Sequence, residues 1–105
     1  MERPFAPDFK NAIIATLGAA GAALYDLGEC STGRTVRVVN TGAGLLMVAA
    51  HTANAQKASA TYGLPIPVAG AAGSVEHFYI DANQRYLSVF STAGTSFGVN
   101  VGQGG

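Results

Sequence analysis

The chain has 105 residues, of which 11% are charged, and its six basic and six acidic residues leave a formal net charge of zero. This length fits one domain with a modest core. The basic residues are dispersed, so we expect no nucleic-acid surface, which needs a cluster of cations that neutralises several phosphates. Globular domains typically have about a quarter of their residues charged, and the low share here favours a surface that is buried against a partner protein.

Cys30 is the only cysteine, which excludes an intramolecular disulfide and a small secreted scaffold stapled by disulfides. This favours synthesis and folding in a reducing cytoplasm. An apolar stretch over residues 12–24 is interrupted by Gly18 and Gly21 and is too short to span a bilayer. Glu2 also opposes the positively charged start of a secretory signal. We therefore expect no membrane partner.

Residues 1–11 are predicted to form an extended N-terminal arm. Pro4 and Pro7 disfavour a helix and bias the preceding residues toward extended geometry. Phe5 and Phe9 either fold back onto the core of the chain or anchor the arm on a neighbouring subunit, and we take them as candidate interface residues. The rest of the chain, residues 12–105, is expected to be a single β-sandwich domain.

Residues 12–29 are compatible with a short helix or with two strands. Ile13, Ile14 and Leu17 would line such a helix, but each internal glycine would weaken it by about 1 kcal/mol relative to alanine. We expect strands over 12–17 and 22–28 with a glycine bend between them.

The middle of the chain starts with a run of β-branched residues over 35–40, which predicts a strand. Turn residues follow, and an apolar run over 45–50 predicts a second strand that forms a hairpin with the first. Residues 51–74 are rich in small residues and prolines, which exclude a central strand and indicate a long contact loop. Within that loop the candidate interface residues are Tyr62, Leu64 and Ile66.

The last third predicts three strands, over 75–81, 85–90 and 96–101, joined by two short turns as a meander. In the final strand Phe97, Val99 and Val101 alternate with polar or small residues, as a half-buried antiparallel strand requires. Six or seven short strands at spacings near ten residues predict an all-β fold, a β-sandwich, jelly roll or small barrel.

The sequence offers little for catalysis. His51 and His77 are the only histidines, and they are far apart from each other and from Cys30. A structural zinc site needs four such ligands and a catalytic one three. The glycine-rich stretches lack the lysine that ends a phosphate-binding loop, and no nucleophile elbow occurs. We therefore predict a protein that is not an enzyme and has no catalytic, cofactor or metal site.

Several segments resemble a known class of proteins. They are the sequence VRVVNTG at residues 36–42, GLPIP at 63–67, RYLSV at 85–89 and VNVGQG at 99–104. In this order they are similar to short virion proteins encoded among the head genes of tailed bacteriophages. The resemblance covers residues 34–104. It implies a capsid decoration or cement protein on the surface of the virion, made in the cytoplasm of the bacterial host. Such a protein would bind the major capsid protein and copies of itself, as a homotrimer.

Two alternatives stay open from the sequence. One is a component of the phage tail or tail fibre. The other is a carbohydrate- or host-surface-binding module, in which Tyr62, Tyr79 and Tyr86 would stack against sugars.

Overall fold

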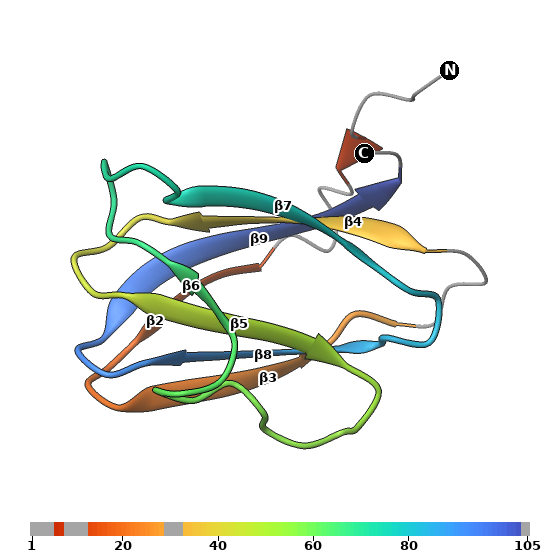
Figure 1. The fold of residues 1–105 in the computed structure, drawn as a ribbon, viewed down its shortest axis with the longest axis horizontal. Coiled ribbons are helices and arrows are strands. Elements are labelled where there is room, and N and C mark those ends of the chain that lie inside the picture. Colours follow the sequence, from red (N-terminus) through yellow and green to blue (C-terminus); the bar gives the residue numbers. More distant parts are fainter. Residues whose placement is uncertain (1–5, 8–12, 29–32, 104–105) are drawn as a thin grey trace.

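A computed structural model describes residues 6–7, 13–28 and 33–103, which form two antiparallel sheets packed face to face (Figure 1). No helix is present among these residues. The strands are β1 (Ala6–Pro7), β2 (Ile13–Leu17), β3 (Gly21–Asp26), β4 (Arg34–Asn40), β5 (Leu46–His51), β6 (Leu64–Ile66), β7 (Val75–Ile80), β8 (Tyr86–Ser91) and β9 (Thr95–Gln103).

The strand order is that of a jelly roll. Sheet A has the order β2-β9-β4-β7, and the short β1 pairs with the last residues of β9, past the stretch that pairs with β2. Sheet B has the order β3-β8-β5-β6. The pairs β5 with β6, β4 with β7, β3 with β8 and β2 with β9 are those of one long hairpin. That hairpin is rolled into two sheets with its tip between β5 and β6, the double-sheet form that buries two sheet faces against each other. The expected all-β sandwich of jelly-roll type is confirmed.

Three local expectations are wrong. β4 and β5 do not form a hairpin, because β4 lies in sheet A and β5 in sheet B. The last three strands alternate between the two sheets and are therefore not a meander. The long loop expected over 51–74 contains the short strand β6, at an edge of sheet B, where Pro65 is tolerated. Turn residues fix where a strand ends but not which sheet the next strand joins.

The core lies between the sheets and follows the alternation of each strand. Val36 and Val38 of β4 are fully buried beside Val99 of β9, and Leu87 and Val89 of β8 face them from sheet B. The rings of Tyr25 and Phe97 meet edge to face across the two sheets, with centroids 6.4 Å apart. The strands thus bury the side chains that their two-residue period predicts.

Most of the predicted N-terminal arm, including Phe5 and Phe9, lies outside the described residues. Its described part is β1, in which Ala6 pairs with Gln103 and Pro7 with Gly102. The arm over residues 1–11 therefore stays a prediction, as does the boundary of the domain at residue 12.

Candidate interaction surface

The connections between strands gather at two opposite ends of the sandwich (Figure 1). We call one the asparagine end, formed by the connections at residues 18–20, 41–45, 67–74 and 92–94. We call the other the arginine end, formed by the connections at residues 27–33, 52–63 and 81–85, of which 29–32 are not described. The two ends differ in charge and in the way their connections are held.

Asn40, at the end of β4, holds the asparagine end together. Its side chain is buried, and its Nδ2 donates to the carbonyl oxygens of Gly44 and Ile66 at 2.8 and 3.0 Å. Its Oδ1 accepts from the Gly42 amide at 3.1 Å and from the Thr95 hydroxyl at 2.7 Å. All four hydrogen-bonding positions of the amide are used. One side chain thus joins the β4–β5 connection to β6 and β9.

Further hydrogen bonds join the remaining connections at this end. The Ser91 hydroxyl donates to the Leu45 carbonyl at 2.7 Å and accepts from the Gly94 amide at 3.1 Å. Backbone bonds run from Ala69 to Gly42 and from Ala20 to Thr92. Each of the four connections is therefore bonded to another one, and together they form a preorganised surface.

Two glycines are needed for this close packing. A Cβ on Gly42 would overlap the hydroxyl of Thr95 and the amide of Ser96, and a Cβ on Gly44 would overlap the carbonyl oxygen of Gly94. Neither glycine has a positive φ. Their role is to let two turns approach each other rather than to permit an unusual backbone conformation.

Charge reaches the asparagine end from β7, where the carboxylate of Glu76 lies beside Gly73, and not from the connections themselves. None of the residues in its four connections is Asp, Glu, Lys, Arg or His, and alanine and glycine predominate. Leu45 is 48% exposed there, and Val68 and Val75 are also exposed. Such a surface has few water-bound charges to strip when it meets a partner.

No described segment outside sheet A covers the outer face of that sheet (Figure 1). Val75 of β7, Val39 of β4, Gly98 of β9 and Ile14 of β2 lie side by side across it. Ile14 is 89% exposed. This apolar row crosses the whole sheet next to the asparagine end, and the glycine keeps it flat.

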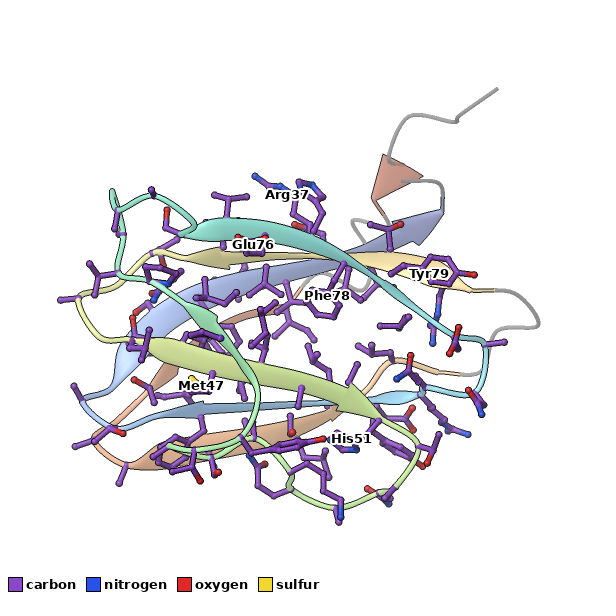
Figure 2. The ribbon with its side chains drawn as sticks, viewed as in Figure 1. Arg37, Met47, His51, Glu76, Phe78 and Tyr79 are labelled. Atoms are coloured by element: carbon purple, nitrogen blue, oxygen red, sulfur yellow. The ribbon has the colours of Figure 1, made fainter. Side chains whose placement is uncertain are left out.

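The next rows of that face contain its polar and aromatic groups. Arg37 is paired with His77 in β7 and with Asn100 in β9. Tyr79 lies beyond them and is 67% exposed. Figure 2 shows Arg37 and Tyr79 on the outer side of sheet A, whereas Phe78 points between the sheets. Arg37 is the one Asp, Glu, Lys or Arg side chain among the described strand residues that face outward here.

The outer face of sheet B is different, because the β5–β6 connection folds back over it (Figure 1). The hydroxyl of Ser88, in β8, is fully buried and accepts from the amides of Ala58 at 2.8 Å and Lys57 at 3.3 Å. It also lies 3.0 Å from Nε2 of His51, whose Nδ1 is 2.8 Å from the Ala53 carbonyl. A carbonyl can only accept, so Nδ1 donates to it, and in the neutral ring Nε2 then accepts from the Ser88 hydroxyl. The histidine and serine therefore fasten a loop to its own sheet.

Most of the charged residues that the structure describes lie at the arginine end. Five of the seven charged residues that the structure describes lie there, namely Asp26, Arg34, Lys57, Asp81 and Arg85. Arg34 is buried and donates to the carbonyls of Leu27 and Gly28 at 2.7 and 3.0 Å. Arg85 binds Asp26 through two hydrogen bonds of 2.6 and 2.7 Å. That contact, helped by the Gly28 amide, lowers the pKa of Asp26 to about 2.

The residues predicted to contact a partner are placed differently by the structure. Tyr62 is 57% exposed and Leu64 is also exposed, both near the start of β6. Ile66 is fully buried in the core, so it is not accessible to a partner. Phe5 and Phe9 lie outside the described residues.

The three tyrosines proposed for sugar binding do not gather. Tyr79 lies on the outer face of sheet A, whereas Tyr62 belongs to the connection that covers sheet B. Tyr86 lies in β8, beneath the guanidinium of Arg85, which is 5.7 Å from the ring centroid. A sugar platform needs aromatic rings on one face, so this arrangement does not favour a carbohydrate site.

The sequence patterns did not predict that Asn40 and Ser88 hold distant segments together. The pattern Asn40-Thr41-Gly42 reads as turn chemistry, which is correct for the backbone but says nothing about a contact with Thr95, far along the chain. Ser88 reads as a small residue between two core residues of a strand. Only the pairing of distant strands reveals what these side chains bind.

Among the described residues, few side chains that could bind a metal lie near one another. No group of three or more His, Cys, Asp or Glu side chains lies together there. No helix among those residues is long and apolar enough to cross a bilayer. Comparison with known proteins gives no match to any family model and no match among curated proteins.

Proposed function

We propose that this chain is a non-enzymatic structural protein of a tailed-phage virion, a capsid decoration or cement protein that binds the major capsid protein. The observation that supports this best is the contrast between the two outer faces. Sheet B is covered by a loop of the chain itself, whereas sheet A exposes a flat apolar row that includes Ile14 and Val75. A monomer working alone in water gains nothing from that exposure.

The mechanism would be burial of the outer face of sheet A against the capsid lattice. Each square ångström of apolar surface removed from water contributes about 25 cal/mol. Many copies on one shell would hold neighbouring capsid subunits together, because each copy that bridges two subunits raises the effective concentration of the next contact. Jelly-roll domains occur among viral capsid proteins, which is an analogy at the level of the fold only.

The test uses capsids of the phage whose genome encodes the chain, prepared without this protein. Adding the wild-type chain should give cosedimentation with the capsids and a higher temperature of capsid disruption. Ile14→Glu places a charge on the exposed apolar row and should abolish binding without unfolding the protein. Ala55→Glu adds the same charge at an exposed site in the β5–β6 connection and should bind as the wild type does.

Unchanged capsid stability with saturating wild-type chain would count against a cement role. Equal binding by Ile14→Glu and Ala55→Glu would remove sheet A as the contact surface. Immunogold labelling of intact virions separates head from tail, and a label at the tail would replace decoration by a tail component.

A further inference from the structure

Arg37 differs from the other two arginines that the structure describes. Arg34 donates to two carbonyl oxygens, and Arg85 binds the carboxylate of Asp26 through two hydrogen bonds. Arg37 is half-buried, yet it makes no hydrogen bond or ion pair with any residue in the described part of the chain. A guanidinium has five N–H donors in a planar fork that matches a carboxylate. The donors of Arg37 are therefore available to an acceptor that the described residues do not supply.

The strand register places two further polar side chains beside Arg37. Its partner in β9 is Asn100 and its partner in β7 is His77, and alternation sends all three side chains to the outer face of sheet A. The amide of Asn40 donates to the carbonyl of Ser74. Alternation along β4 then makes Arg37 and His77 a pair without mutual backbone hydrogen bonds, the kind in which side chains lie closest. We call Asn100, Arg37 and His77 the Arg37 row.

We propose that the Arg37 row binds a carboxylate of the protein that covers sheet A, an Asp or Glu side chain set among apolar residues. The inference rests on the proposed role of sheet A as the contact with the capsid, and it adds the chemistry of the partner surface. The carboxylate would accept two parallel hydrogen bonds from the guanidinium of Arg37 and a further one from the side-chain amide of Asn100.

The neighbours of the Arg37 row determine what surrounds that carboxylate. On one side lies the apolar row of sheet A, with Val39 and Val75 two residues away along β4 and β7. On the other side lies Tyr79, whose hydroxyl is so close to the backbone of Gly33 that a Cβ there would overlap it. A protein that covers these groups excludes water from the ion pair, which strengthens the attraction between its charges. The partner should therefore have apolar side chains on both sides of its acid.

Charge favours an acidic protein surface over other occupants. Nucleic acid and anionic lipid need several cations, whereas Arg37 is the one Asp, Glu, Lys or Arg side chain on the described outer face of sheet A. Glu76 of β7 does not lie on this face, because its carboxylate points toward Gly73. Two copies that met through sheet A about a two-fold axis would thus bury two guanidinium groups without an acid for either.

The first test compares capsid binding by variants of the full-length chain. Arg37→Gln should weaken binding by about thirtyfold or more, because it leaves the acid of the partner buried without its cation. Arg37→Lys keeps the charge but not the planar fork, so its affinity should lie between those of Arg37→Gln and the wild type. A change from low salt to 0.5 M NaCl should weaken the wild type more than Arg37→Gln.

The matched control is Lys57→Gln, which removes the same charge from an exposed site in the β5–β6 connection and should bind as the wild type does. Circular dichroism melting establishes that each variant is folded. Equal capsid binding by Arg37→Gln and the wild type would overturn the proposal. Self-association of the wild type without capsids, lost in Arg37→Gln, would also overturn it, in favour of a second copy.

A second test needs no capsid. The probes are two tripeptides, acetyl-Leu-Glu-Val-amide and acetyl-Leu-Gln-Val-amide, which are titrated to about 20 mM into the isotope-labelled chain and followed by NMR. The Glu peptide should shift the side-chain signals of Arg37 and Asn100, and should bind at least about tenfold more tightly than the Gln peptide. No preference for the Glu peptide, or larger shifts at Lys57 than at Arg37, would overturn the proposal.

These results are separable from the proposed function. If Arg37→Gln and the wild type bind capsids equally, the cement role stays and the carboxylate contact is lost. If the wild type ignores capsids but prefers the Glu peptide, the carboxylate contact stays and the cement role is lost.

Discussion

The two ends of the sandwich use different kinds of hydrogen bond to hold the connections between strands in place. At the asparagine end a buried neutral amide is hydrogen-bonded on all four positions to three separate segments. At the arginine end a guanidinium caps two carbonyls, and an exposed ion pair joins Asp26 to Arg85. Neutral hydrogen bonds hold the first set of connections, whose own residues include no charge, whereas charged side chains hold the second set.

The largest expected effect is at Asn40. Asn40→Ala removes the partner of two buried carbonyls, one amide and one hydroxyl, so we expect a loss of about 3–5 kcal/mol in the free energy of unfolding. Urea denaturation of the monomeric protein measures it. Asn83→Ala, at an exposed site of the arginine end, should cost less than about 0.5 kcal/mol. A loss below 1 kcal/mol at Asn40 would mean that water replaces the amide.

Close packing of the turns predicts the next effect. Gly44→Ala should destabilise by about 1–3 kcal/mol, because the added methyl group overlaps the carbonyl of Gly94. Gly18→Ala is the matched control, since a Cβ there meets nothing within 4 Å and the residue has no positive φ. Thermal melting of both variants compares them directly. Equal melting temperatures would contradict the tight contact between the β4–β5 and β8–β9 connections.

The β5–β6 connection, which covers sheet B, predicts a smaller loss of stability that is confined to the residues near Ser88. Ser88→Ala leaves the amide of Ala58 without its buried acceptor, so we expect a loss of about 1–2 kcal/mol. Hydrogen exchange should speed up at the amides of Lys57 and Ala58 while the β4–β5 connection is unchanged. Ser59→Ala, whose hydroxyl makes only exposed contacts, should stay within about 0.5 kcal/mol of the wild type. Slow exchange at Ala58 in Ser88→Ala would show that other contacts hold the loop.

The smallest effect on stability is expected at the exposed ion pair. Arg85→Gln should raise the pKa of Asp26 from about 2 toward its ordinary value of 3.8. Because the folded pKa lies below the ordinary one, the contribution of the pair is present above about pH 4 and is lost as the pH falls toward 2. NMR titration of the carboxyl group measures the shift. Lys57→Gln serves as the control and should not move the midpoint, and a midpoint near 4 in the wild type would contradict the pairing.

The sequence predicted what depends on local periodicity. The inward residues of β8 and β9, among them Val89 and Val99, followed from alternation alone, and so did the all-β fold. The pairing of strands was wrong where it relied on neighbours, as for β4 with β5. In a jelly roll each strand except those at the tip pairs with strands distant in the sequence, and no short motif encodes that choice. The hydrogen bonds around Asn40 were unpredictable for the same reason, because the segments that they join meet only after rolling.

Hydrogen exchange of the chain, free as a dilute monomer and bound on capsids, tests the central claim most directly. The account predicts added protection in sheet A, along β2 near Ile14 and in β7 near Val75, whose side chains lie on its outer face. It predicts no added protection in the β5–β6 connection over 52–63, which already covers its own sheet. Protection concentrated in residues 52–63 or at Asp81 and Arg85, with none along β2 and β7, would contradict the account.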